Sequence, residues 1–192
     1  VPLLTVSRTP FAPLTDSGGQ IPGAVVDRAG RKNLFQTAGD DLGLSQLAYN
    51  FLGGVMHSAT ALCGIFNPTV NSYKRIDAPV TSSGSTWSPN SVTYAGNNRT
   101  HMIRVPDAGR FELRLMDGST NPYLSQAGIL AAGLDGINNE RDPGKPLHVN
   151  MYEEGHKIRS AKKLPVTLLD ALRLLEKNQV LREALGDEAI NA

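Results

Sequence analysis

The most constraining feature of this sequence is a long apolar periodicity in its first half. Between positions 41 and 66, apolar residues recur at three- and four-residue steps, which predicts a helix with a wide buried face. The residues on this face are Leu44, Leu47, Ala48, Phe51, Leu52, Val55, Met56, Ala59, Leu62 and Cys63. The helix should end at Asn67-Pro68, because a residue that precedes proline disfavours the helical conformation. Polar residues and glycines interrupt the stretch, so it lacks the composition of a membrane span.

The composition places this helix in a globular protein that is almost neutral. Of 192 residues, 40% are hydrophobic and 19% are charged, which is typical of a folded domain. The net charge of +1 indicates neither a nucleic-acid surface nor an acidic tail. A single cysteine, Cys63, excludes an internal disulfide framework and suits a reducing compartment. The first residues do not have the pattern of a secretion signal, so we expect a cytoplasmic protein.

Shorter elements are predicted in the rest of the chain. Strands are expected at residues 100–105 and 111–115, and in the second one the apolar residues alternate with Glu112 and Arg114, which therefore share the opposite face. A helix should start at the capping pair Asn121-Pro122, run to about residue 134 and stop near Gly136. Two more helices are expected, one capped by Thr167 and one over residues 180–185. This pattern predicts an α+β architecture.

Cationic side chains gather on the short strands and loops between residues 67 and 124. They are Lys74, Arg75, Arg99, Arg104, Arg110 and Arg114, with few acidic residues among them. An arginine offers two parallel donors, which suit the paired oxygens of a carboxylate or phosphate. Glu112, in their midst, would either pair with an arginine or hold a divalent metal. The alternative is a set of surface ion pairs, each contributing about 0–1 kcal/mol. The charge pattern alone leaves both interpretations open.

Several motifs, in order along the chain, resemble the glutamine synthetase family. Residues 67–75 (NPTVNSYKR) resemble the family's NPT-x-NSYKR signature, and residues 98–106 resemble its NR-x-x-x-x-R-(I/V)-P strand. Residues 110–114 resemble its R-x-E-x-R strand, while residues 121–124 (NPYL) and 131–137 (AAGLDGI) are similar to the helix that follows. The resemblance implies that residues 30–192 are the C-terminal part of that family's catalytic domain, with a mostly antiparallel sheet and packed helices.

The resemblance also implies a reaction and a role for each matched residue. ATP would phosphorylate the glutamate side chain, and ammonia or a small amine would displace phosphate from the γ-glutamyl phosphate. By their motifs, Arg75 would bind the substrate glutamate, and Arg99 and Arg114 would be catalytic at the transferred phosphate. Arg104 and Arg110 would bind the nucleotide, and Glu112 would hold Mg²⁺ or Mn²⁺. Family members form homo-oligomeric rings whose active sites lie between subunits.

This sequence also departs from the family pattern. No glutamate follows Arg75 at the position of the family's flap, and the loop with Trp87 resembles the branch that contains γ-glutamylmethylamide synthetases. The resemblance therefore favours an amine other than ammonia, with Trp87 either a lid residue or part of the loop packing. Residues 1–29 are expected to be a largely irregular leader unlike the family, since residues 17–23 lack the histidines of the family's G-x-H-x-H motif.

Three interpretations remain open at this stage. The first is an incomplete ligase that functions only with the missing part of the active site. The second is a non-catalytic relative that keeps a nucleotide- or anion-binding surface or an oligomer-forming role. The third is a scaffold with no ligand. The histidines at positions 57, 101, 148 and 156 lack metal-ligand spacing, so none is assigned as a ligand.

Overall fold

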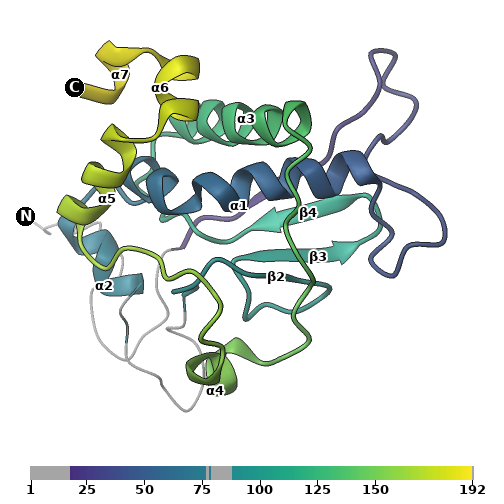
Figure 1. Ribbon diagram of the computed structural model, residues 1–192, viewed down its shortest axis with the longest axis horizontal. Coiled ribbons are helices and arrows are strands. Elements are labelled where there is room, and N and C mark those ends of the chain that lie inside the picture. The colour runs from purple at the N-terminus through teal and green to yellow at the C-terminus, as the bar shows by residue number, and fades with distance from the viewer. Residues whose placement is uncertain (1–17, 77, 79–87, 192) are drawn as a thin grey trace, which may run out of the picture.

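The computed structural model describes residues 18–76, 78 and 88–191, which form an α+β fold around one sheet (Figure 1). The strands are β1 (Ile21–Gly23), β2 (Tyr94–Ala95), β3 (Ile103–Asp107) and β4 (Arg110–Leu113). Their order across the sheet is β1-β4-β3-β2. β4 pairs antiparallel with both β1 and β3, whereas β2 pairs parallel with β3. The predictions of an α+β fold and a mostly antiparallel sheet are therefore confirmed.

The long apolar helix is α1 (Gln46–Phe66), which begins later than the periodicity suggested. Its N-cap is Ser45, whose hydroxyl accepts a hydrogen bond from the Ala48 N–H at 3.2 Å. The preceding residues form a turn instead, because the Asp40 carboxylate accepts the N–H groups of Leu42 and Leu44 at 3.0 Å each. The helix ends where Pro68 predicted, with Asn67 as its C-cap.

The second long helix is α3 (Pro122–Asn138), capped by Asn121 as predicted. The Asn121 side chain accepts the N–H groups of residues 123 and 124 at 2.9 and 3.2 Å. The helix continues past Gly136, so the predicted stop there was wrong. A Cβ on Gly136 would lie 2.2 Å from the Asn50 carbonyl oxygen, which shows that this glycine permits close packing of α3 on α1.

Several short helices complete the fold. They are the 3-10 helix η1 (Val70–Ser72), α2 (Tyr73–Ile76), α4 (Met151–Glu154), the 3-10 helix η2 (Gly155–Lys157), α5 (Leu168–Glu176), α6 (Gln179–Leu185) and α7 (Asp187–Asn191). The predicted cap of α5 is confirmed, because the Thr167 hydroxyl accepts the Asp170 N–H at 3.2 Å. The predicted end of α6 at Gly186 is also confirmed, and this glycine has a φ of 86°. No sequence pattern predicted the short helices α2, α4 and α7.

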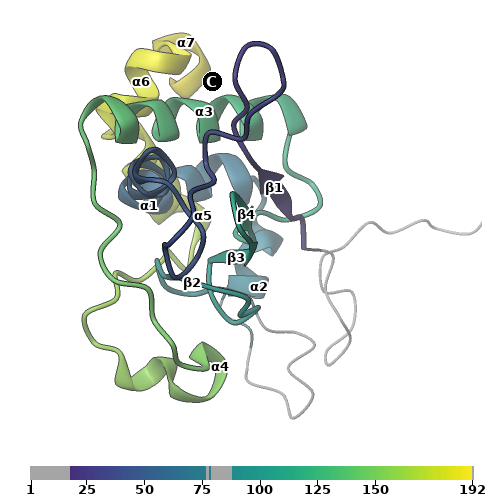
Figure 2. The same ribbon diagram turned by 90° about the vertical axis from the view of Figure 1, so that its right-hand side faces the viewer.

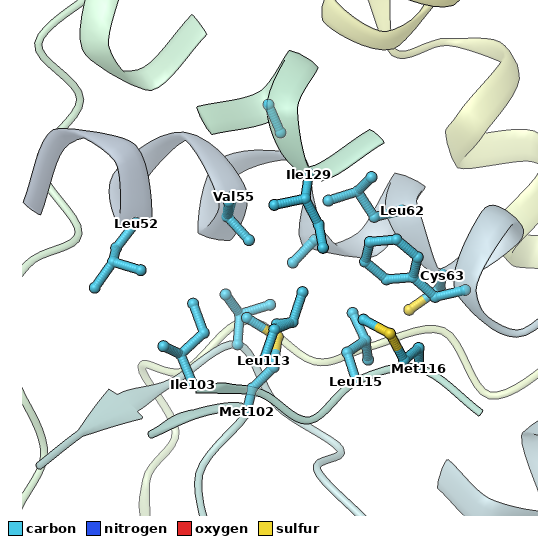
Figure 3. Packing of buried hydrophobic residues seen from close by; sticks show 14 of the residues in the cluster. Leu52, Val55, Leu62, Cys63, Met102, Ile103, Leu113, Leu115, Met116 and Ile129 are labelled. Carbon is cyan, nitrogen blue, oxygen red and sulfur yellow. The ribbon is translucent and has the colours of Figure 1, made fainter. Parts of the chain in front are cut away.

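The core lies between α1, α3 and one face of the sheet. Figure 2, which looks along α1, shows α1 and α3 together on one side of the strands. Figure 3 shows side chains of α1, such as Leu52 and Val55, facing Ile103 of β3 and Leu113 of β4, with Ile129 of α3 close by. Cys63 is fully buried in this cluster, as its position on the apolar face predicted. The polar residues therefore occupy the other face of the strands.

The segment expected to be an irregular leader, residues 1–29, contributes a strand to this sheet. β1 pairs with β4, placing Pro22 opposite Glu112. The first residues of that segment, and the loop with Trp87, lie outside the described residues. Over the helices that the structure does describe, none is long and apolar enough to cross a membrane.

Candidate phosphate and substrate site

The polar face of the β3–β4 hairpin has the alternation that the sequence predicts. Phe111 and Leu113 of β4 are 2% and 0% exposed and point into the core. Glu112, between them, points to the opposite face, and Arg114 lies two residues further along. Antiparallel pairing places Arg104 of β3 directly opposite Glu112. The register of the hairpin thus brings together two predicted phosphate-binding arginines and the predicted metal ligand.

Glu112 is the centre of a charged cluster. One of its carboxylate oxygens, Oε2, accepts a hydrogen bond from Nη1 of Arg104 at 2.9 Å. The other, Oε1, accepts one from Nη1 of Arg114 at 2.6 Å. The three side chains are 11–16% exposed, so water screens these pairs only in part. The cluster carries two positive charges and one negative charge.

Ionisation of Glu112 depends on these arginines. Burial raises the pKa of the Glu112 carboxyl, but the hydrogen bonds and positive charges of Arg114 and Arg104 outweigh burial, so this pKa lies below its ordinary value. The carboxyl is therefore ionised at neutral pH and acts as a fixed counterion between the two guanidinium groups.

Asn97 extends the cluster and was missed by the sequence analysis. Its Oδ1 accepts hydrogen bonds from Nε and Nη2 of Arg104 at 2.9 and 2.6 Å. Arg104 is thus held from two sides, by Asn97 and by Glu112, with its guanidinium plane fixed. The signal for this contact was weak, because an asparagine in a turn usually serves its own backbone.

Arg75 lies in α2 and is buried. It is 3% exposed, and its Nη2 donates to the carbonyl oxygens of Leu115 and Met116 at 2.7 and 2.6 Å. Its Nη1 donates to the Ser88 hydroxyl. These bonds tie α2 to the chain that leaves β4, so Arg75 stands at the end of the strand that carries Glu112.

Arg99 and Arg110 are the two exposed members of the predicted set. Arg99 occupies the loop between β2 and β3, and its neighbour Asn98 donates to the Val149 carbonyl at 3.0 Å. Arg110 lies at the hairpin turn, where its Nε and Nη2 donate to the Asp107 carboxylate at 2.9 and 2.5 Å. Within the described part of the chain, neither arginine donates a hydrogen bond to Glu112.

The histidines, none of which was assigned as a ligand, form no metal centre in the described residues. His101 is fully buried, with Nε2 3.0 Å from the Val149 carbonyl oxygen, and burial lowers its pKa. His57 lies on the outer side of α1. Partial burial of its ring and the nearby charge of Arg141 lower its pKa.

The residues around Glu112 do not fit a divalent cation. Mg²⁺ and Mn²⁺ prefer several oxygen ligands, whereas both Glu112 oxygens here are hydrogen-bonded to arginines. Across residues 18–76, 78 and 88–191, no three histidine, cysteine, aspartate or glutamate side chains are grouped to hold a metal. The position opposite Glu112 on β1 is Pro22, which has no ligand atom in its side chain.

The α+β fold and the arginine-rich strand can be compared with known families of catalytic domains. The glutamine synthetase catalytic-domain family matches residues 10–192, and the chain belongs to that family. The match runs through the boundary that was expected at residue 29.

The chain is similar to complete enzymes of which it spans less than half. It is 55% identical over 184 residues to the glutamine synthetase of Rhizobium meliloti (strain 1021), covering 96% of this chain and 42% of that protein. It is 48% identical over 162 residues to the glutamate–methylamine ligase of Methyloversatilis universalis, covering 82% of this chain and 36% of that one. The relatives thus include a glutamine synthetase and a glutamate–methylamine ligase.

Solved structures share the fold. A complex of a glutamate–methylamine ligase (GmaS) with ADP aligns with a TM-score of 0.89 and 56% identity, over 96% of this chain and 42% of that one. GmaS without ligand aligns with a TM-score of 0.86 and 52% identity, over 96% and 41% of the two chains.

Proposed function

We propose that this chain forms the phosphate- and glutamate-binding part of an ATP-dependent ligase that joins the glutamate side chain to ammonia or a small amine. The observation that carries the proposal is the pairing of Glu112 with Arg104 and Arg114 on the polar face of the sheet. The family match and the similarity to a protein solved with ADP support it. The chain spans about two-fifths of its relatives, so turnover would require groups from the remainder of such a protein.

Each of the five predicted arginines has a role in this proposal. Arg114 and Arg99 stabilise the negative charge that develops on the phosphate during its transfer to the glutamate carboxylate. Arg104, oriented by Asn97, and Arg110, at the exposed hairpin turn, bind the nucleotide phosphates. Arg75 binds the substrate glutamate from the end of β4. An amine then attacks the γ-glutamyl carbonyl carbon, phosphate leaves with the electrons of the C–O bond, and the nitrogen gives up one proton to the phosphate or to water.

Methylamine is the amine that we favour, and ammonia is the alternative. The chain has no glutamate in the nine residues after Arg75, and GmaS structures align with it closely. We further expect a cytoplasmic homo-oligomer with active sites shared between subunits.

A second candidate function is binding without catalysis. The misfit between Glu112 and a divalent cation favours it, because metal ions neutralise phosphate charge in the family reaction. Such a protein would bind ATP or another phosphate-bearing anion through the same arginines. The two candidates differ in whether an amide product forms.

The test is complementation between this chain and part of a relative. The chain is co-expressed with the region of the Rhizobium meliloti glutamine synthetase that lies outside the match, then given ATP, Mg²⁺, glutamate and either methylamine or ammonia. ADP and the amide product are measured by mass spectrometry. The matched control is the same relative divided at the same point. If the divided relative is active and the complemented chain forms no amide with either amine, the ligase proposal is wrong.

A further inference from the structure

We infer that Glu112 acts in this chain as the counterion of an anion site, so that ATP binds to the polar face of the sheet without a divalent cation. This inference rests on the proposed function, because it concerns the same phosphate site. It departs from the role of metal ligand that the family resemblance implies for Glu112.

Both oxygens of the Glu112 carboxylate are already hydrogen-bonded to arginines. Oε1 and Oε2 of Glu112 each accept a hydrogen bond from a different guanidinium group, at 2.6 and 2.9 Å. A metal ion could reach only the remaining lone pairs of these oxygens, where it would lie beside a guanidinium cation. Each bond is charge-assisted, and such bonds are about twice as strong as neutral ones. The carboxylate is therefore committed to the arginines.

The second argument is the charge of the site. Arg104, Arg114 and Glu112 together carry a charge of +1, and Asn97 adds a neutral acceptor. This net positive charge would repel a divalent cation and attract the phosphates of ATP. With side chains only 11–16% exposed, the surrounding water weakens this preference less than it would on an open surface.

The third argument is the neighbouring strand. β1 runs antiparallel beside β4, and Pro22 is the residue paired with Glu112. Its neighbours in the strand, Ile21 and Gly23, also lack side-chain ligand atoms, so β1 supplies no side-chain metal ligand. The strand that lies beside the carboxylate thus offers a cation no second carboxylate.

The fourth argument is an unused donor. The buried Nε of Arg114 has no hydrogen-bond acceptor within the described part of the chain. A buried donor without a partner is costly, and an anion that shifts the guanidinium slightly would supply the acceptor. The site therefore has capacity for an acceptor group but not for a cation.

The experiment uses the purified chain, with its folding verified by circular dichroism. ATP is titrated calorimetrically in EDTA and again with Mn²⁺, and Mn²⁺ alone is followed by the paramagnetic resonance signal of the free ion. The variants are Glu112→Gln and, as the matched control, Arg173→Gln, which removes an exposed charge on α5. We expect ATP to bind in EDTA, and Mn²⁺ alone to give the same free-ion signal with wild type and Glu112→Gln.

Three results would overturn the inference, and they have different meanings. If wild type binds Mn²⁺ and Glu112→Gln does not, Glu112 is a metal ligand, and the proposed ligase function stands. If the folded wild type binds no ATP with or without Mn²⁺, the arginines form no phosphate site in this chain, and the phosphate-binding part of the proposed function fails as well. If wild type binds ATP with Mn²⁺ but not in EDTA, binding requires the cation and the inference is also wrong. Both ATP results need only wild type, so a poorly folded variant does not affect them.

Discussion

The two faces of the β3–β4 hairpin are built on different principles. One face carries Ile103 and Leu113, both fully buried against α1 (Figure 3). The other carries Arg104 and Glu112, held by hydrogen bonds of defined direction. The apolar face should tolerate substitutions among hydrophobic side chains of similar volume. The polar face depends instead on individual donor–acceptor pairs. Stability should therefore come mainly from the first face and ligand binding from the second.

The largest effect is expected where the helices behind the apolar face meet. A Cβ on Gly54 of α1 would lie 2.0 Å from the Ala132 carbonyl oxygen of α3. Because this atom belongs to a helix backbone, the two helices would have to separate, and Gly54→Ala should lower the free energy of unfolding by about 3 kcal/mol or more. Urea denaturation measures this.

Gly64→Ala in the same helix is the control for that prediction. There the nearest atom is the flexible Leu175 side chain at 3.1 Å, and alanine favours the helix by about 1 kcal/mol. Equal destabilisation by the two variants would contradict the close packing of α1 on α3.

The next effect concerns the apolar face itself. Leu113 is fully buried, so Leu113→Ala should cost about 2–5 kcal/mol through lost burial and the cavity left behind. Chemical denaturation would show this as a lower midpoint with an unchanged slope. A variant as stable as wild type would mean that this face is not the core of the hairpin.

A smaller effect on stability is expected on the polar face, and it depends on pH. The folded pKa of Glu112 lies below its ordinary value of 4.5, so its ionised form stabilises the fold above about pH 4.5, and this is lost as the pH falls through the folded pKa. Glu112→Gln should cost about 2–3 kcal/mol at pH 7, because Arg104 and Arg114 lose their counterion. Its disadvantage should shrink on acidification, as followed by melting temperatures between pH 7 and 3. A constant difference over that range would contradict the assigned ion pairs.

The smallest effect is expected at the exposed end of the hairpin. Arg110 and Asp107 have side chains that are 45% and 68% exposed. Arg110→Ala should therefore change the free energy of unfolding by no more than about 0.5 kcal/mol, measured in the same denaturation series. A loss similar to that of Glu112→Gln would show that exposed and partly buried ion pairs contribute alike here.

The fold was predictable where local rules decide the structure. Asn121 and Thr167 cap their helices as their positions suggested, because capping needs only the next few residues. Gly136 misled the analysis, since its reason for being glycine is the backbone of α1, which lies far away in sequence. The short strand β1 was missed because its pairing with β4 is equally non-local.

The candidate site was predictable as a group of residues but not as a geometry. Alternation placed Glu112 and Arg114 on one face, and the family motifs added Arg104. The role of Asn97 and the position of Pro22 opposite Glu112 depend on strand register, which no local pattern in these short strands specifies. The roles assigned to all six site residues remain predictions.

The central claim is that the polar face of the hairpin binds phosphates, and one comparison tests it directly. ATP is titrated calorimetrically onto wild type, Arg114→Gln and the exposed control Arg173→Gln. Since a hydrogen bond to a charged group contributes about 1.5–3 kcal/mol, Arg114→Gln should bind ATP at least about tenfold more weakly, and the control should match wild type. Equal affinities for wild type and a folded Arg114→Gln would contradict the claim.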